Sequence, residues 1–105
     1  MRNAKEEFIK TVTGLKVICA EIVKCDNDYE FNENCSSYQL KVGHSDEEYN
    51  EFLREIDFNY DSGYGGQELF GTIWCGAGVW FDREEYDGSE WWDMHQYPEI
   101  PEELK

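Results

Sequence analysis

Residues 68–97 read ELFGTIWCGAGVWFDREEYDGSEWWDMHQY, and this stretch decides the fold. Two short glycine-containing segments, Gly76-Ala77-Gly78 and Asp87-Gly88, divide it, and turns of this kind join antiparallel strands. The three runs that remain are rich in aromatic and β-branched residues, as strands are: Glu68–Cys75, Val79–Glu84 and Glu90–Tyr97. The stretch therefore predicts a three-stranded antiparallel meander.

The two turns also predict the register, and the register assigns each side chain to a face. If Cys75 lies opposite Val79 and Tyr86 opposite Ser89, further pairs follow: Trp74 with Trp80, Thr72 with Asp82, Glu84 with Trp91, Asp82 with Asp93 and Trp80 with His95. One face is then apolar and suited to burial; it carries Leu69, Ile73, Cys75, Val79, Phe81, Trp92 and Met94. The other face mixes aromatic with charged side chains; it carries Phe70, Trp74, Trp80, Asp82, Glu84, Trp91, Asp93, His95 and Tyr97. That second face is either a surface that binds arginine and lysine side chains or a face that a helix also covers.

The residues before the meander predict two helices and a hairpin. Asn3 is a suitable N-cap for a helix that ends near Val12, before Gly14, with a buried stripe of Phe8, Ile9 and Val12. Ser45 and Glu48 have the spacing of a capping box, which predicts a second helix to about Ile56. Strands are expected at Leu15–Cys25, Ser37–Val42 and Phe58–Asp61, with a polar loop between the first two and a glycine-rich turn at 63–66.

Together these elements predict an α+β fold. A chain of 105 residues has the length of one domain, so a single domain is expected over residues 1–105. Its antiparallel sheet should have about five to six strands, with the two helices packed mainly on one face.

The chain carries 9 basic and 24 acidic residues, which gives a formal net charge of −15. The excess lies in the second part: residues 1–44 carry 6 basic and 7 acidic residues, and residues 45–105 carry 3 and 17. A surface this negative repels nucleic acid and anionic membranes and attracts cationic partners. Neither an apolar run of about 20 residues nor an export signal is present. We therefore expect a cytoplasmic protein whose partners are neither membranes nor nucleic acid itself.

Four cysteines, Cys19, Cys25, Cys35 and Cys75, include no C-x-x-C pair. Without the spacing of a zinc site and without an export signal, free and mostly buried thiols are expected.

Asp82 and Asp93, with Glu84 and His95 close by, have the chemistry to hold a hard cation. A metal-assisted phosphodiester hydrolase is the enzymatic alternative that this group allows. The net charge of −15 opposes the approach of a polyanionic substrate. We therefore expect no enzymatic activity, no metal and no cofactor.

Carboxylates on one strand face lie about 7 Å apart, a distance on the order of that between consecutive phosphates in a nucleic acid strand. A row of them can imitate a phosphate track and occupy the basic channel of a nucleic-acid-binding protein. The predicted contact residues are acidic side chains of the meander, two tryptophans that stack on arginine, and an acidic ridge on the second helix: Asp82, Glu84, Glu85, Asp87, Glu90, Asp93, Trp80, Trp91, Asp46, Glu47, Glu51 and Glu55.

Three segments resemble those of small acidic proteins from phages and mobile elements: GYGGQELFGTIW at 63–74, YDGSEWW at 86–92 and PEIP at 98–101. In size and acidity the chain is similar to anti-CRISPR proteins, several of which imitate DNA to block an RNA-guided nuclease. The resemblance implies a non-enzymatic inhibitor that acts in the host bacterial cytoplasm on a basic host-defence nuclease, above all an RNA-guided one. Two alternatives remain open: an immunity protein against a basic nuclease toxin, and an acidic assembly module that forms homodimers through the tryptophan-rich face.

Overall fold

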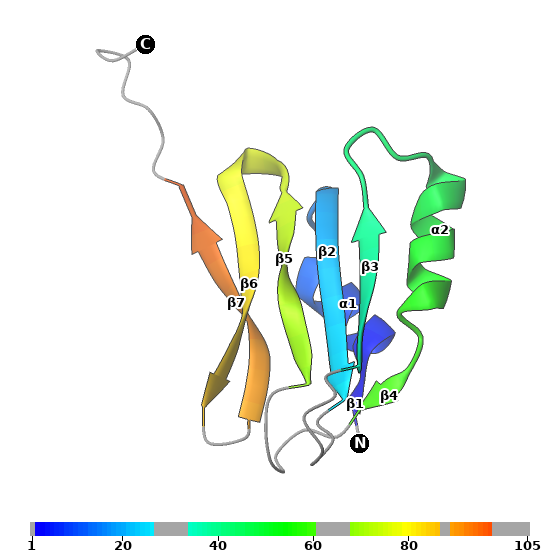
Figure 1. Cartoon of the computed structure of the whole chain (residues 1–105). Helices are drawn as coiled ribbons and strands as arrows, with labels where there is room; N and C mark the ends of the chain where they lie inside the picture. The colour runs from blue at the N-terminus through cyan, green and yellow to red at the C-terminus, as the bar shows by residue number, and fades with distance from the viewer. Residues whose placement is uncertain (1, 27–33, 61–67, 87–88, 98–105) are drawn as a thin grey trace.

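The computed structural model describes residues 2–26, 34–60, 68–86 and 89–97. Two helices and seven strands are present in these ranges (Figure 1). In chain order they are β1 (Arg2–Asn3), α1 (Ala4–Val12), β2 (Val17–Asp26), β3 (Asn34–Leu40), α2 (Asp46–Glu55), β4 (Asn59–Tyr60), β5 (Leu69–Cys75), β6 (Val79–Tyr86) and β7 (Ser89–Gln96).

Five of the strands form one antiparallel sheet in the order β3-β2-β5-β6-β7. The two shortest strands, β1 and β4, pair with each other in a separate two-stranded sheet. The predicted α+β class is therefore confirmed. The short strand expected at Phe58–Asp61 exists as β4 but belongs to the small sheet, because it pairs with the residues just before α1.

Both helices begin where their capping residues predict. The Asn3 side chain accepts a hydrogen bond from the Glu6 backbone N–H at 3.0 Å, and α1 follows. Ser45 and Glu48 form the reciprocal capping box, with distances of 3.1 and 3.2 Å, and α2 follows. Each bond satisfies a backbone N–H that has no partner within the first turn of a helix.

The core lies between the helices and one face of the large sheet. Phe8 of α1 packs edge-on against Phe52 of α2, with ring centroids 5.5 Å apart. The sheet contributes buried side chains from its three central strands and from β3: Ala20, Ile22, Leu40, Leu69, Ile73, Cys75 and Phe81. Figure 1 shows α1 behind β2 and α2 beside β3, so both helices lie at the β3 end of the sheet.

Two residues predicted to be buried are exposed instead. Ile9 is 41% exposed because the buried stripe of α1 runs through Ala4, Phe8 and Val12, one turn apart each, and Ile9 lies off that line. Met94 is 62% exposed although it lies on the inner face of the sheet. It belongs to β7, the edge strand farthest from β3, and no helix lies behind β7 in Figure 1.

Gly71 permits β2 and β5 to approach closely. Its φ of 145° suits glycine, and a Cβ atom placed there would lie 2.0 Å from the Glu21 carbonyl oxygen. A side chain at this position would push the two central strands apart.

The expectation of four free thiols is wrong for one pair. Cys25 and Cys35 face each other across β2 and β3, with Cα atoms 4.1 Å apart, and form a disulfide. Sequence spacing gave no sign of this, because the two strands extend further toward the loop than predicted and so place the cysteines opposite each other. Cys19 and Cys75 are free thiols, and burial raises the pKa of each above its ordinary value.

Two of the predicted turns, at 63–66 and at Asp87-Gly88, lie outside the described residues. Within the described ranges, no helix combines the length and the apolar character needed to cross a membrane.

Candidate functional site

The outer face is the side of β5, β6 and β7 that points away from the helices. The register predicted from the turns is confirmed: Trp74 pairs with Trp80 and Trp80 with His95, Thr72 pairs with Asp82 and Asp82 with Asp93, and Glu84 pairs with Trp91. The outer face therefore carries Phe70, Thr72, Trp74, Trp80, Asp82, Glu84, Trp91, Asp93 and His95.

Aromatic side chains on this face remain open to solvent. Trp74 is 41% exposed, and Phe70 and Trp91 are each 39% exposed. Both helices pack on the opposite side of the sheet, toward β3 (Figure 1). In the described part of the chain no helix covers this face, so that alternative is wrong.

An acidic cluster, composed of Asp82, Glu84, Asp93 and His95, lies at the centre of the β6–β7 hairpin. One polar atom from each side chain lies within 4.8 Å of the others. The Nε2 atom of His95 lies 2.7 Å from Asp82 Oδ1 and 3.3 Å from Asp93 Oδ2. Three carboxylates thus share one imidazole, which carries at most one positive charge.

Repulsion within the acidic cluster acts on the carboxyl group of Glu84. The negative charge of Asp82, together with a hydrogen bond to that side chain, raises the pKa of Glu84 above its ordinary value. Asp93 contributes in the same direction, and His95 opposes it. A cation placed among these carboxylates would relieve the repulsion. The cluster offers oxygen ligands and one nitrogen ligand, and it also suits a guanidinium or ammonium group.

Beside the acidic cluster, aromatic rings form a stack that borders a pocket. Trp80 stacks on His95, with centroids 4.3 Å apart, and faces Tyr97 at 6.0 Å. The aromatic pocket has a volume of about 230 Å³ and opens at the β5–β6 turn. It is lined by Ile18, Cys19, Trp74, Cys75, Gly78, Val79, Trp80 and Tyr97.

Glu90, predicted to be a contact residue, is buried. It is only 1% exposed. Glu90, Trp92 and Met94 are every second residue of β7, so all three lie on the inner face of the sheet. Its carboxylate accepts hydrogen bonds from the backbone N–H groups of Glu68 and Leu69, at 2.9 and 3.1 Å. Glu90 is thus part of the interior and is not available to a partner.

Arg83 is the counter-charge of Glu90, and sequence reasoning missed it. Its guanidinium is fully buried and donates to Glu90 Oε1 at 3.0 Å from Nε and 2.9 Å from Nη2. It also donates to Glu7 Oε1 at 2.6 Å and to the Tyr60 hydroxyl at 2.7 Å, and Tyr60 in turn donates to Glu7. We call Arg83, Glu90, Glu7 and Tyr60 the buried ion network. Its signal in the sequence was alternation, since Arg83 shares its strand face with Phe81.

The four acidic residues of α2 are exposed but lie elsewhere. Asp46, Glu47, Glu51 and Glu55 form the predicted ridge on the solvent side of α2. The helix packs beside β3, at the other end of the sheet order from β7 (Figure 1). The ridge and the outer face are therefore two separate acidic patches.

Of the remaining predicted contacts, Glu85 is exposed and is paired with Glu90, next to the Tyr86–Ser89 pair at the end of the hairpin where β6 connects to β7. Asp87 lies outside the described residues.

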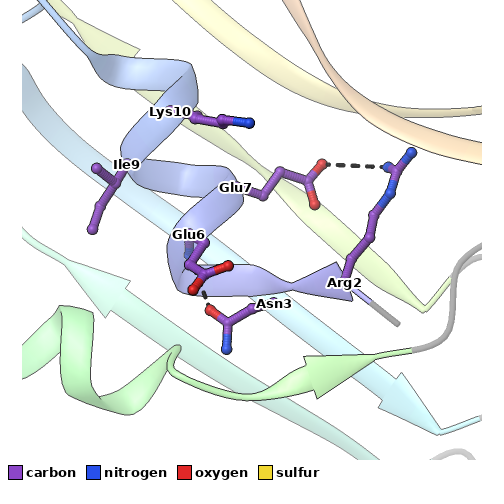
Figure 2. Close-up of a pocket in the computed structure, with 6 residues that line it drawn as sticks. All are labelled: Arg2, Asn3, Glu6, Glu7, Ile9 and Lys10. Atoms are coloured by element: carbon purple, nitrogen blue, oxygen red, sulfur yellow. Dashed lines mark hydrogen bonds and ion pairs between the residues drawn. The ribbon is translucent and has the colours of Figure 1, made fainter.

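A second pocket, of about 590 Å³, lies along the first turns of α1. Figure 2 shows Glu7 pointing toward Arg2 and the Asn3 side chain turned to the start of the helix. The Arg2 Nη1 atom lies 3.8 Å from Glu7 Oε1 and donates to the Glu90 carbonyl at 2.7 Å. Arg2 and Glu7 are therefore engaged with each other and with the buried ion network, and the polar side chains of Glu6 and Lys10 complete the lining of the pocket.

Comparison with protein-family models, with curated proteins and with solved structures found no match to this chain. Functional reasoning therefore depends on the geometry of the outer face.

Proposed function

We propose that this protein is a non-enzymatic inhibitor that binds a basic, nucleic-acid-binding host-defence nuclease through its outer face. One observation carries the proposal: an uncovered sheet face on which exposed tryptophans flank three clustered carboxylates. An arginine can stack on an indole ring and pair with a carboxylate at the same time. A surface of this composition fits a partner rich in arginine and lysine.

The charge of the whole chain favours a protein partner over nucleic acid. At −15 the molecule repels polyanions and is drawn to basic channels. RNA-guided nucleases hold their guide duplex and target strand in such channels. The carboxylates of Asp82, Glu84 and Asp93 lie within 4.8 Å of one another, so they present one compact negative site to a cationic side chain of such a channel.

Binding is favoured over catalysis for a related reason. The acidic cluster has the donor atoms for a divalent ion, but a phosphodiester substrate would have to approach it against the charge of the protein. The cluster lies on a sheet face between exposed aromatic rings, which is a setting for contact with another protein.

The proposal places the protein in the host bacterial cytoplasm, where Cys25 and Cys35 would be reduced. The disulfide closes the far end of the β2–β3 pair, and none of its atoms belongs to the acidic cluster or to the aromatic pocket. Inhibition is therefore expected to be the same with and without a thiol reductant.

A second candidate, a homodimer formed through the same face, is favoured by the exposure of Phe70, Trp74 and Trp91. A two-fold dimer places one patch against its own copy. The acidic cluster lies at the centre of this patch, so its carboxylates would face the same carboxylates of the second chain. Association through aromatic burial would persist at high salt, whereas binding to a basic partner would not.

The test begins with immobilised protein and a bacterial lysate, at salt concentrations from about 50 to about 500 mM. The proposal predicts retention of a basic nuclease at low salt, its release as salt rises, and inhibition of that nuclease when both proteins are purified. Retention of no nuclease at low salt, or retention without inhibition, would contradict it. Self-association that survives the highest salt concentration would favour the homodimer.

A further inference from the structure

The aromatic pocket is an apolar recess on an otherwise charged part of the outer face. Its lining includes Trp74, Trp80 and Tyr97 together with Cys19 and Cys75. Trp74 and Tyr97 are 41% and 63% exposed, so the pocket is open to a side chain from outside.

The aromatic pocket and the acidic cluster are adjacent. Trp80 lines the pocket and stacks on His95, and His95 contacts Asp82. Trp80 and Asp82 are two residues apart on one face of β6, which corresponds to about 7 Å. The aromatic pocket and the acidic cluster are therefore separated by two residues along β6.

Charge complementarity indicates what occupies this face. The occupant needs an apolar group for the recess and, one step away, a cation for the carboxylates. In an extended segment, side chains two residues apart lie on one side at about 7 Å, the same distance. Arginine suits the cation position better than lysine, because its planar group stacks on an aromatic ring and donates to two carboxylates at once.

We propose that the outer face binds an extended partner segment of the form apolar–x–arginine, with the apolar side chain in the aromatic pocket and the guanidinium on the solvent-exposed side of the Asp82 and Asp93 carboxylates, beside His95. This inference rests on the proposed function, since it names the part of a basic partner that the outer face recognises. It adds a requirement of sequence order that charge attraction alone does not impose.

The test uses the full chain labelled with ¹⁵N and four synthetic peptides of equal length. One contains Leu-Ser-Arg, and a second has the same composition in the order Leu-Arg-Ser, which turns the two side chains to opposite sides. A third contains Leu-Ser-Lys, and a fourth contains Ser-Ser-Arg. The signals of the indole N–H groups of Trp74, Trp80, Trp91 and Trp92 report on four places in the hairpin and its neighbours.

The expected result is that Leu-Ser-Arg shifts the signals of Trp74 and Trp80 at the lowest concentration. Each of the other three peptides should bind about tenfold more weakly: Leu-Arg-Ser loses the spacing, Ser-Ser-Arg loses the apolar contact, and Leu-Ser-Lys loses the planar group that stacks and donates to two carboxylates. The signal of Trp92, on the inner face, should not move.

Matched variants locate the contact. Trp74→Ala and Asp93→Asn should each weaken Leu-Ser-Arg binding by about tenfold. Phe70→Ala removes an equally exposed aromatic ring from the same strand but outside the pocket, and Glu47→Gln removes one charge from α2. Both control variants should bind within about twofold of the natural chain.

Three outcomes would overturn the inference. If the four peptides bind alike and Glu47→Gln costs as much as Asp93→Asn, attraction is diffuse, and the proposed function stands without a preferred segment. If no peptide shifts the indole signals while the intact basic nuclease still binds, recognition uses another part of the partner. If Mn²⁺ alone broadens the Trp80 signal at micromolar concentration, and His95→Gln prevents it, the cluster is a metal site. If, in any of these cases, the intact basic nuclease also fails to bind, the proposed function is wrong too.

Discussion

Acidic side chains have opposite kinds of partner on the two faces of the β6–β7 hairpin. On the inner face, Glu90 is buried against Arg83, which also binds Glu7 and Tyr60. On the outer face, Asp82 lies opposite Asp93 with Glu84 beside them, and only one imidazole is shared among the three. Glu90 and Asp93 lie three positions apart on β7, so one side chain points inward to an arginine and the other points outward to carboxylates of like charge. The inner carboxylate stabilises the fold, and contact with a partner is the role that we propose for the outer ones.

The largest expected effect comes from breaking the buried ion network. Arg83→Met leaves the fully buried carboxylate of Glu90 without its counter-charge and should lower the free energy of unfolding by about 3–5 kcal/mol. Urea denaturation followed by tryptophan fluorescence measures it. Glu90→Gln keeps one acceptor oxygen, enough for the Leu69 N–H, but places an NH2 donor opposite the Glu68 N–H. It should still cost less than Arg83→Met, because Arg83 keeps its ion pair with Glu7 and no buried charge is left without a partner. A loss below about 1 kcal/mol for Arg83→Met would show that the network is not structural.

The same network should make stability fall at high pH. Burial, together with the hydrogen bond to Glu7, raises the pKa of Tyr60 from its ordinary 10.0 to about 12. Because the folded state favours the neutral phenol, this contribution is fully present below pH 10 and is lost as the pH rises toward 12. The expected decrease in the free energy of unfolding is about 2–3 kcal/mol.

Tyr60→Phe is the matched control for this pH dependence. The difference between the unfolding curves of the two proteins isolates Tyr60 from the other tyrosines and the lysines. An identical decrease in both proteins between pH 10 and 12 would contradict the assignment.

On the outer face, removing a charge should stabilise the protein. Asp93→Asn ends the direct opposition of two carboxylates and should raise the free energy of unfolding by about 0.5–1 kcal/mol at low salt. The gain should shrink in about 1 M salt, because screening already weakens the repulsion in the natural chain. Thermal unfolding at both salt concentrations measures it, and a loss of stability would mean that the contact with His95 outweighs the repulsion.

The smallest expected effect concerns the proton of Glu84. Carbon-detected NMR titration should show the pKa of this carboxyl above the ordinary value, and Asp82→Asn should return it toward that value. Since the shift is upward, any strain that Glu84 adds is present at neutral pH and is relieved as the pH falls through its pKa. Glu84→Gln should therefore differ from the natural chain in stability at pH 7 and not at pH 3. A pKa at or below the ordinary value would contradict the described repulsion.

The sequence was most informative where local rules are strict. The capping residues Asn3 and Ser45 located both helices, and the turns predicted the register of the meander, including the pairs of Trp74 with Trp80 and of Asp82 with Asp93. These features depend on backbone hydrogen bonds between near neighbours, so a single sequence carries them.

What sequence reasoning missed depends on contacts between distant residues. Arg83 is 76 residues from Glu7, and neither residue type signals burial by itself. The disulfide required the register of β2 and β3 to be known, and the place of α2 at the far end of the sheet required the whole topology. The burial of Glu90, in contrast, could have been predicted from the sequence. Glu90 is two residues before Trp92 on β7, so it lies on the same inner face, and its charge alone led to the wrong prediction of a contact residue.

The most direct test compares the two acidic patches at equal charge. Asp82→Lys with Asp93→Lys reverses two charges on the outer face, and Glu47→Lys with Glu51→Lys reverses two on α2, so both double variants have the same net charge. The measurement is the affinity of each for the basic nuclease that the natural chain retains. We predict that the outer-face variant loses binding by about a hundredfold or more while the α2 variant loses less than about tenfold. Equal losses in the two variants, or a larger loss from α2, would contradict the claim that the outer face is the working surface.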